Sequence, residues 1–471
     1  MVLWTAADIF QIVRGESEGS WQADGVSIDT RTLNPGDVFV AIGGEKFDGH
    51  DYVAQALEKG AVAAIVSHIP DGMDMNSSLV LVPDVMKVLE AMARYRRERI
   101  RSGIIGVTGS VGKTTVKEML RFVLSDQDKT SATEGNLNNH IGLPLSLVRM
   151  EEDCRYGVFE MGMNHAGEIK DLTGLVRPDV AIITAIEAVH LEFFANESEI
   201  AAAKSEIFLS MDARGVAVIP GDSPYYSLLM QEAQRQGVGR IVRFGLRDEY
   251  EAQLISVQPY AGGQKIRAKI AGLELQYVLP VLGEHHALNS VIALAAVEAI
   301  GADVEKASKI MEQWCPPSGR GESSVLPIPF SGQKSGSYTL IDDAYNASPA
   351  SMRAALEVLA IRKELGKGAR SIAVLGDMLE LGEKSSFLHA NLSEYIMRQK
   401  IDRVYCAGNL MKHLAHQLPP SVLAEYVGEA EDLLPLLQAD IQVGDYVLIK
   451  GSHGSNMWKL VKDLKQSSVT V

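Results

Sequence analysis

The sequence predicts an α/β protein of several domains, built around a central, doubly wound parallel sheet that carries a phosphate loop. Three observations predict this fold. The chain has 471 residues, which is too long for one hydrophobic core. Beyond residue 103, short β-branched apolar runs alternate with helix-forming stretches, as in parallel sheets with crossover helices. The stretch GIIGVTGSVGKTTVKEML, residues 103–120, joins one such strand to a helix through a glycine-rich turn.

This turn has the residue types that bind phosphate. Its glycines let backbone N–H groups converge at the N-terminus of a helix, where the helix dipole favours anions. Lys113 supplies a charge for outer phosphates, and Thr114 or Thr115 offers a hydroxyl for Mg²⁺. Val107 stands where the usual pattern has its first glycine, so the loop is a variant. A plain strand-to-helix turn is the alternative; the flanking strand and the double threonine favour a nucleoside triphosphate site formed by Thr108, Gly109, Ser110, Val111, Gly112, Lys113, Thr114 and Thr115.

The composition excludes several classes of protein. An apolar content of 46% and a charged content of 22% are ordinary for a globular protein. The net charge of −15 argues against a nucleic-acid partner. Cys154, Cys315 and Cys406 lie far apart, without histidines at zinc spacing, so neither disulfides nor a zinc site is expected. The first residues do not resemble a secretion signal and no apolar run reaches about 20 residues, so we expect a cytoplasmic protein without membrane insertion.

Three domains are expected, at residues 1–84, 85–315 and 316–471, with prolines and glycines at 316–321 marking the second boundary. The first reads as a small α/β unit with a helix that begins at Ala6, capped by Thr5. A helix from Asp84 to Arg101 ends in a cluster of arginines, which suits a solvated helix C-terminus better than a ligand patch. Between Gly245 and Leu282 we expect several short strands.

In parallel sheets, ligands bind beyond the carboxyl ends of the strands, so polar residues at these ends are site candidates. Glu160 follows one predicted strand, Glu187 and His190 follow the next, and a loop rich in asparagine spans residues 136–140. A carboxylate beside a phosphate loop is well placed to hold Mg²⁺. Lys204 lies in a predicted helix, where the ordinary interpretation is a solvated lysine. In the third domain, the acidic pair at 342–343, Asp377, and the KGS string at 450–452 also end strands.

Several strings taken together resemble the Mur ligases of peptidoglycan synthesis: TGSVGKTT, EGNLNNHIGLP, FEMGMNHAGEI, AVHLEFF, AKSEIF, GEHHALN, PSGRGE, IDDAYNASPASM, LGDMLELGE and VLIKGS. The resemblance covers all three predicted domains. It implies a three-domain Mur ligase architecture with a UDP-sugar-binding domain, a central ATP-binding domain, and a Rossmann-like domain that closes on ATP and binds a dipeptide. The strings SIDTR and FVAIGGEKFDGHDY are similar to the uridine-nucleotide domain, which replaces a plain surface-turn interpretation of these segments.

The resemblance also implies an activity. It predicts ATP-dependent ligation of UDP-N-acetylmuramoyl-tripeptide to D-alanyl-D-alanine through an acyl phosphate, by a monomer. A member that adds a single amino acid is the alternative, although the carboxylate-reading arginine motif of the ligase for the third amino acid is not found here. A phosphate-loop kinase or motor NTPase would leave the third domain unexplained, and a non-catalytic nucleotide-binding module would leave Glu160, His190 and Lys204 unexplained.

Residue by residue, the resemblance implies a catalytic set of Lys113, Glu160, His190 and Lys204. Thr114, Glu160, His190 and a carbamylated Lys204 would hold two Mg²⁺ ions. Asn289 would face the adenine, while Arg320 and Asp343 would reach the ribose and phosphates from the third domain. Val189 and Trp458 depart from the usual pattern. The residues expected at the substrates are Ser27, Asp29, Arg31, Lys46, Asp48, His50, Asn138, Asn139 and Asn346.

Overall fold

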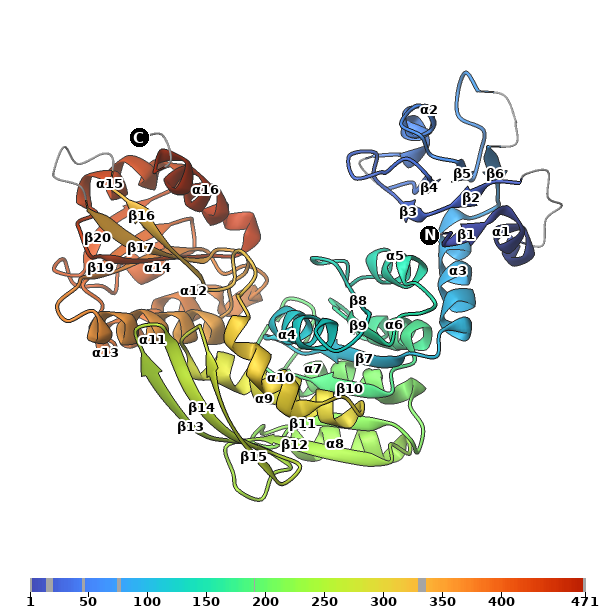
Figure 1. Cartoon of the computed structure of the whole chain (residues 1–471). Helices are drawn as coiled ribbons and strands as arrows, with labels where there is room; N and C mark the ends of the chain where they lie inside the picture. The colour runs from blue at the N-terminus through green and yellow to red at the C-terminus, as the bar shows by residue number, and fades with distance from the viewer. Residues whose placement is uncertain are drawn as a thin grey trace.

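The computed structural model describes residues 2–13, 20–44, 47–73, 78–189, 191–328 and 336–468. These residues form sheets of four, nine and six strands and a two-stranded ribbon, and each large sheet belongs to one stretch of the chain. Figure 1 shows the three resulting domains: the central domain lies below, and the N-terminal and C-terminal domains stand at opposite sides above it. Within the described ranges, no helix is long and apolar enough to cross a membrane.

The N-terminal domain contains a parallel sheet of order β3-β4-β5-β6. Every residue of its two middle strands is buried, as expected where both faces of a parallel sheet are covered. The first helix begins after Thr5 as predicted, and Thr5 Oγ1 accepts a hydrogen bond from the Asp8 amide (3.2 Å). The elements are β1 (Trp4–Thr5), α1 (Ala6–Val13), β2 (Gln22–Ala23), β3 (Gly25–Ser27), β4 (Asp37–Val40), α2 (Val53–Glu58), β5 (Ala63–Val66) and β6 (Leu79–Leu81).

The helix α3 (Val85–Arg99) links the N-terminal and central domains, and one prediction about its arginines is wrong. Arg96 is buried rather than solvated. Its guanidinium lies 4.4 Å from the centre of the Trp4 ring and donates to the Leu3 carbonyl. Trp4 in turn donates to the carbonyl of Val148 in the central domain (2.9 Å). The arginine cluster therefore helps to fasten the N-terminal strand to the central domain.

The central sheet has the order β15-β14-β13-β12-β11-β10-β7-β9-β8. The strands from β8 to β13 in this order pair in parallel, and β14 and β15 extend the sheet in antiparallel pairing, in the region where short strands were expected. The elements are β7 (Gly103–Thr108), α4 (Lys113–Ser125), β8 (Thr130–Ala132), α5 (Gly142–Arg149), β9 (Tyr156–Glu160), α6 (Glu168–Val176), β10 (Val180–Ile183), α7 (Glu197–Ser205), β11 (Val216–Pro220), α8 (Tyr226–Arg235), β12 (Arg240–Gly245), β13 (Ala252–Tyr260), β14 (Gly263–Ile270), β15 (Leu273–Leu279), α9 (Glu284–Ala299) and α10 (Val304–Ile310).

Helices cover both faces of this sheet, which confirms the doubly wound prediction. Successive residues of a strand point to opposite faces. Accordingly, Ile104 packs in the core that includes α3, α5 and α6, whereas Ile105 packs in the core that includes α4 and α9. β7 lies between β10 and β9, so the loops that follow these three strands leave the sheet side by side.

The C-terminal domain has a six-stranded sheet of order β16-β17-β21-β18-β19-β20, with helices on both faces. Its helix α11 runs beside the β13–β14 extension of the central sheet (Figure 1), where Arg362 donates to the Ala261 carbonyl (3.2 Å). The elements are β16 (Glu322–Pro327), β17 (Ser337–Asp343), α11 (Pro349–Leu365), β18 (Ser371–Gly376), α12 (Ser385–Ala390), α13 (Leu392–Arg398), β19 (Arg403–Ala407), α14 (Lys412–Ala415), β20 (Leu423–Val427), α15 (Leu433–Asp440), β21 (Tyr446–Lys450) and α16 (Met457–Ser467).

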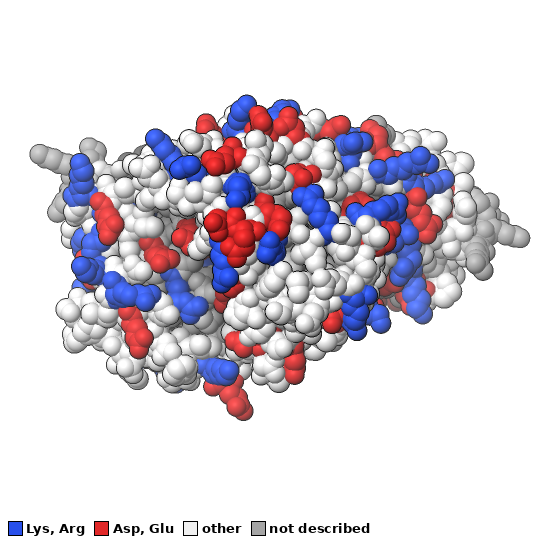
Figure 2. All heavy atoms as spheres, turned by 90° about the horizontal axis from the view of Figure 1, so that it is seen from below, with Lys and Arg blue, Asp and Glu red and all other residues white. Residues whose placement is uncertain are grey.

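Acidic and basic side chains are interspersed on the face of the molecule seen from below (Figure 2). The central domain contains exposed or half-exposed ion pairs of this kind, such as Arg240 with Glu298 (2.7 Å) and Arg243 with Glu251 (2.8 Å). Such pairs contribute little to stability but neutralise charge locally.

Candidate active site

The phosphate loop lies between β7 and α4, at the carboxyl edge of the central sheet. Gly109 has φ +147° and Gly112 has φ +87°, both in the region that favours glycine. Both glycines also allow close approach, because a Cβ would lie 1.9 Å from Thr184 Oγ1 at Gly109 and 2.9 Å from Asn289 Oδ1 at Gly112. The Ser110 amide donates to the Ala185 carbonyl (2.8 Å), which ties the loop to the end of β10.

Lys113 folds back over the loop that precedes it. Its Nζ donates to the Gly109 carbonyl (2.8 Å). Burial lowers the pKa of Lys113; the Glu160 carboxylate opposes this shift, and Arg320 of the C-terminal domain adds to it. A phosphate oxygen is a stronger acceptor for an ammonium group than a carbonyl, so this lysine is poised to exchange one for the other.

Glu160 is the last residue of β9 and is almost completely buried, with 1% of its surface exposed. Its Oε2 accepts a hydrogen bond from Thr114 Oγ1 (2.9 Å), and its Oε1 accepts one from Asn138 Nδ2 (2.8 Å). The structure therefore brings three predicted residues into direct contact at the mouth of the phosphate loop. A hydroxyl and a carboxylate so close together are the oxygen donors that Mg²⁺ prefers, so these residues fit the ion. His190, the other predicted protein ligand from this edge, lies outside the described residues.

Lys204 lies near the end of α7 and is 1% exposed, so the solvated-lysine interpretation is wrong. Burial lowers its pKa well below the usual value, and the charge of Lys113 adds to the shift. The site thus contains a buried lysine within electrostatic reach of the phosphate-loop lysine.

The C-terminal domain adds charged groups to this edge of the sheet. Arg320 stacks over the Tyr345 ring (4.3 Å to its centre) and lies within electrostatic reach of Lys113 and Asp343. Asp343 Oδ2 pairs with Lys450 Nζ (2.7 Å). Burial raises the pKa of Asp343, and Lys450 opposes the shift.

The two neighbouring aspartates of β17 have different roles, because adjacent strand residues point to opposite faces. Asp342 is buried and accepts hydrogen bonds from Ser318 Oγ (3.2 Å) and the Gly319 amide (3.1 Å), so it fixes the segment that joins the two domains. The exposed Asn346 bends its own turn, with Oδ1 accepting from the Ala347 amide (2.8 Å).

The start of α9 also faces this region. Asn289 is 9% exposed, and its amide lies against Gly112. His286, one turn earlier, is buried and abuts Gly321, whose Cβ would lie 3.3 Å from Nε2. Its Nδ1 finds no hydrogen-bond partner within the described part of the chain. Burial lowers the pKa of His286 well below its usual value, with His285 and Lys450 adding to the shift.

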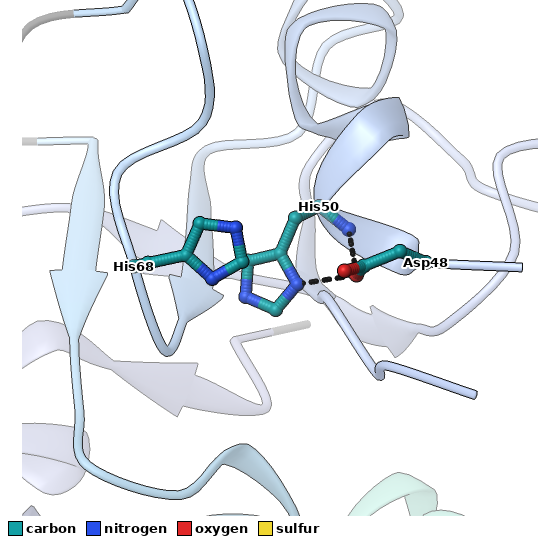
Figure 3. Close-up of side chains that lie close together, drawn as sticks. All are labelled: Asp48, His50 and His68. Carbon is teal, nitrogen blue, oxygen red and sulfur yellow. Dashed lines mark hydrogen bonds and ion pairs between the residues drawn. The ribbon is translucent and has the colours of Figure 1, made fainter. Parts of the chain in front are cut away.

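The N-terminal domain holds most of the remaining predicted residues. Asp48, His50 and His68 lie together (Figure 3), with their ligand-type atoms within 4.8 Å. The Ser67 amide donates to His50 Nε2 (2.9 Å), so His50 carries its proton on Nδ1 and donates it to Asp48 (2.6 Å). This hydrogen bond and that from the His50 amide lower the pKa of Asp48.

The His68 ring stacks on that of His50, with centroids 4.0 Å apart and planes inclined by 19°. Ring nitrogens bind metals in the plane of the ring, and stacked rings do not converge on one ion. The cluster is therefore better suited to holding its loop in place than to binding a metal.

The other predicted substrate residues make local contacts. Ser27 Oγ donates to the Asp29 carbonyl (3.0 Å), and the exposed Arg31 pairs with the Asp29 carboxylate (2.5 Å). Asn139 Oδ1 accepts from the Gly142 amide (2.9 Å) at the start of α5. Lys46 lies outside the described residues.

Sequence reasoning missed Lys117 in α4, which is fully buried. Lys450 was predicted only as part of a polar strand end, without a partner; it is 2% exposed and holds Asp343. For Lys117 a signal was present, since the lysine stands three residues before Leu120 and seven before Leu124, on an otherwise apolar helix stripe.

Fold and site together are those of a phosphate-loop protein in which a third domain brings Arg320 within electrostatic reach of the loop lysine. Three family models match the chain: the Mur ligase middle domain at residues 107–297, the Mur ligase glutamate ligase domain at 330–453, and the Mur ligase family catalytic domain at 22–97. The chain belongs to the Mur ligase family.

Similar proteins of the family share one name over their full length. UDP-N-acetylmuramoyl-tripeptide--D-alanyl-D-alanine ligase of Bacillus subtilis is 34% identical, with 100% of both chains covered. The protein of that name from Rickettsia prowazekii is 32% identical over 98% of this chain and 99% of its own.

Two solved structures of proteins of this family are also similar to this chain. MurF from Acinetobacter baumannii superposes with a TM-score of 0.84 at 30% identity, covering 98% of this chain and 99% of that one. MurF ligase from Thermotoga maritima in complex with ADP superposes with a TM-score of 0.77 at 26% identity, covering 94% and 97%.

Proposed function

We propose that this chain joins UDP-N-acetylmuramoyl-tripeptide to D-alanyl-D-alanine at the expense of ATP. The observation that carries this proposal is the contact of Thr114 and Asn138 with the two oxygens of Glu160 beside the phosphate loop. Through this contact, an acidic residue that can bind a metal lies beside the phosphate loop. The chain is also similar over its whole length to proteins named UDP-N-acetylmuramoyl-tripeptide--D-alanyl-D-alanine ligase.

The chemistry explains why a phosphate site is needed. A carboxylate does not react with an amine at neutral pH, so the γ-phosphoryl group is first transferred to a carboxylate oxygen, and the bond to the ADP oxygen breaks. The dipeptide amine then attacks the carbonyl carbon and loses a proton. The C–N bond forms as inorganic phosphate leaves with the original carboxylate oxygen.

The residues of this chain bring two anions together in the first step. Lys113 and the loop amides bind the outer phosphates, and Arg320 adds a positive charge from the C-terminal domain. Asp343 would accept hydrogen bonds from the ribose, and Asn289 would contact the base. We assign the tripeptide nucleotide to the N-terminal domain, where Ser27, Asp29, Arg31, Lys46, Asp48 and His50 belong, with Asn138, Asn139 and Asn346 at the substrates' reacting ends.

Thr114, Glu160, His190 and Lys204 would hold Mg²⁺, two ions in all. Bound there, the ions would offset the charge of the phosphates and the carboxylate. For Lys204 to contribute, its neutral amine would add CO₂ and lose a proton, which yields a carbamate whose single negative charge is shared by two oxygens. The burial of Lys204 supports this proposal because it favours the reactive neutral amine.

Phosphate release tests the proposed function when it is measured with ATP alone, with ATP and the tripeptide nucleotide, with the complete mixture, and with a single amino acid in place of the dipeptide. Release is expected only when ATP, UDP-N-acetylmuramoyl-tripeptide and D-alanyl-D-alanine are all present, together with a pentapeptide product of the matching mass. Equal release with a single amino acid in place of the dipeptide would assign the chain to another ligase of the family. Release without any acceptor would make it a plain NTPase.

A further inference from the structure

Lys117 is a buried charge that the proposed mechanism does not use. It lies on α4, one turn after Lys113, and none of its surface is exposed. Lysines are almost never fully buried unless they are paired, because removing the ammonium from water is costly. Here three acceptors compensate: the carbonyls of Thr133 (2.7 Å) and Gly135 (3.3 Å), and the carboxylate of Glu118 (2.7 Å).

Two of these acceptors belong to the loop between β8 and α5 rather than to α4 itself. Thr133 is 1% exposed and also contacts β9, because its Oγ1 accepts a hydrogen bond from the Glu160 amide (3.1 Å). Lys117 therefore holds the carbonyl of the same residue whose hydroxyl holds the backbone of Glu160.

The hydrogen bond from Lys117 to the Gly135 carbonyl helps to place Asn138, the second residue that supports Glu160. Gly135 has φ +52° and begins the turn that leads to Asn138, whose amide donates to Glu160 Oε1. Through Thr133 and Gly135, Lys117 thus ties both supports of this carboxylate to the helix that bears Thr114, the donor to Oε2. Glu160, Asn138 and Thr114 are therefore all held, directly or through the loop after β8, by α4.

We infer that Lys117 is a positioning residue that sets the place and orientation of Glu160 relative to Thr114 for binding a divalent cation. The inference rests on the proposed function, since it takes Glu160 as a metal ligand. Groups that orient metal ligands from outside the coordination sphere typically change metal affinity by about 10- to 100-fold when removed.

The test measures binding of Mn²⁺, as a spectroscopic substitute for Mg²⁺, to the full-length protein saturated with ADP, by electron paramagnetic resonance. Lys117→Met keeps the length of the side chain but removes the charge and the hydrogen bonds. It is expected to weaken Mn²⁺ binding about 10-fold while ADP affinity in EDTA stays within about twofold of the wild type. Lys129→Met is the matched control, because Lys129 is a partly exposed lysine paired with Glu151 and Asp153.

A second variant, Thr133→Val, tests the inference even if Lys117→Met does not fold. Thr133→Val keeps the shape and the carbonyl but removes the acceptor for the Glu160 amide, and we expect a smaller loss of Mn²⁺ affinity in a protein that is less stable but still folded at the assay temperature. Unchanged Mn²⁺ affinity in a folded Lys117→Met protein, or in Thr133→Val if the former does not fold, would overturn the inference. So would an equal loss of metal-free ADP binding, which would make Lys117 a general support of α4.

Glu160→Gln separates this inference from the proposed function. If Glu160→Gln weakens Mn²⁺ binding and Lys117→Met does not, only the inference fails. If Glu160→Gln leaves Mn²⁺ affinity unchanged, the metal role of Glu160 fails and the inference fails with it.

Discussion

At the scale of single residues, burial decides which groups can take part in chemistry. Lys204 and Lys117 are both buried lysines, but their surroundings differ. Lys117 is held by three acceptors on α4 and on the loop after β8, whereas burial and the charge of Lys113 lower the pKa of Lys204 well below its usual value. The difference explains why we assign a positioning role to the first and a reactive amine to the second.

Lys204→Ala should lose most ligase activity, by about 100-fold or more, because the carbamate oxygens would no longer reach the metal. Short carboxylic acids such as acetate should restore part of the activity by occupying the vacant ligand position. Lys170→Ala, which changes an exposed lysine of α6, is the matched control and should be fully active. In ¹³CO₂-equilibrated wild-type protein a carbamate signal is expected by NMR. Full activity of Lys204→Ala without added acid would return this lysine to a packing role.

At the scale of elements, the phosphate loop and α4 could be predicted because their signals are local: an apolar run, glycines, then helix formers. The buried state of Lys204 could have been inferred from its alanine neighbours. The register of β13–β15 depends on pairing between distant residues, and the contacts of Lys117 are made to backbone carbonyls that any residue provides. Neither the register of these strands nor the hydrogen bonds of Lys117 can be predicted from the residue types in the sequence. The arginines of α3 show the same limit, since nothing near Arg96 in the sequence indicates that Trp4 covers it.

Gly109→Ala should destabilise the phosphate loop by more than the positive φ of this position alone would cause. The new Cβ would collide with Thr184, whose Oγ1 donates to the Val111 carbonyl (2.6 Å) and shapes the loop. We expect a loss of about 1–3 kcal/mol in unfolding free energy and clearly weaker ADP binding in calorimetric titrations. Gly237→Ala has a similar backbone requirement (φ +75°) but open space around the Cβ, so it should leave ADP affinity unchanged. Equal ADP affinities in the two variants would mean that the close approach at Gly109 does not matter for the nucleotide.

At the scale of the whole molecule, the central domain connects the two others, which stand at opposite sides of it (Figure 1). The N-terminal domain is attached through Trp4 and through Arg149, which donates to the Val26 carbonyl (2.8 Å). The C-terminal domain rests against α9 and brings Arg320 within electrostatic reach of Lys113. The domain boundaries at 84/85 and 315/316 remain predictions, and so does a monomeric state. A ligation of three substrates fits this arrangement, since each domain can present one of them while the phosphate loop stays fixed.

The proposed ligation depends on an acyl phosphate intermediate, and the fate of one oxygen atom shows whether this intermediate forms. UDP-N-acetylmuramoyl-tripeptide is labelled with ¹⁸O in its terminal carboxylate and converted with ATP and D-alanyl-D-alanine, and the phosphate is analysed by mass spectrometry. If the γ-phosphoryl group is transferred to the carboxylate, each phosphate released with a ligated product carries one ¹⁸O from the substrate. Product formed together with unlabelled phosphate would contradict the account, because the carboxylate oxygen would then have left by another route.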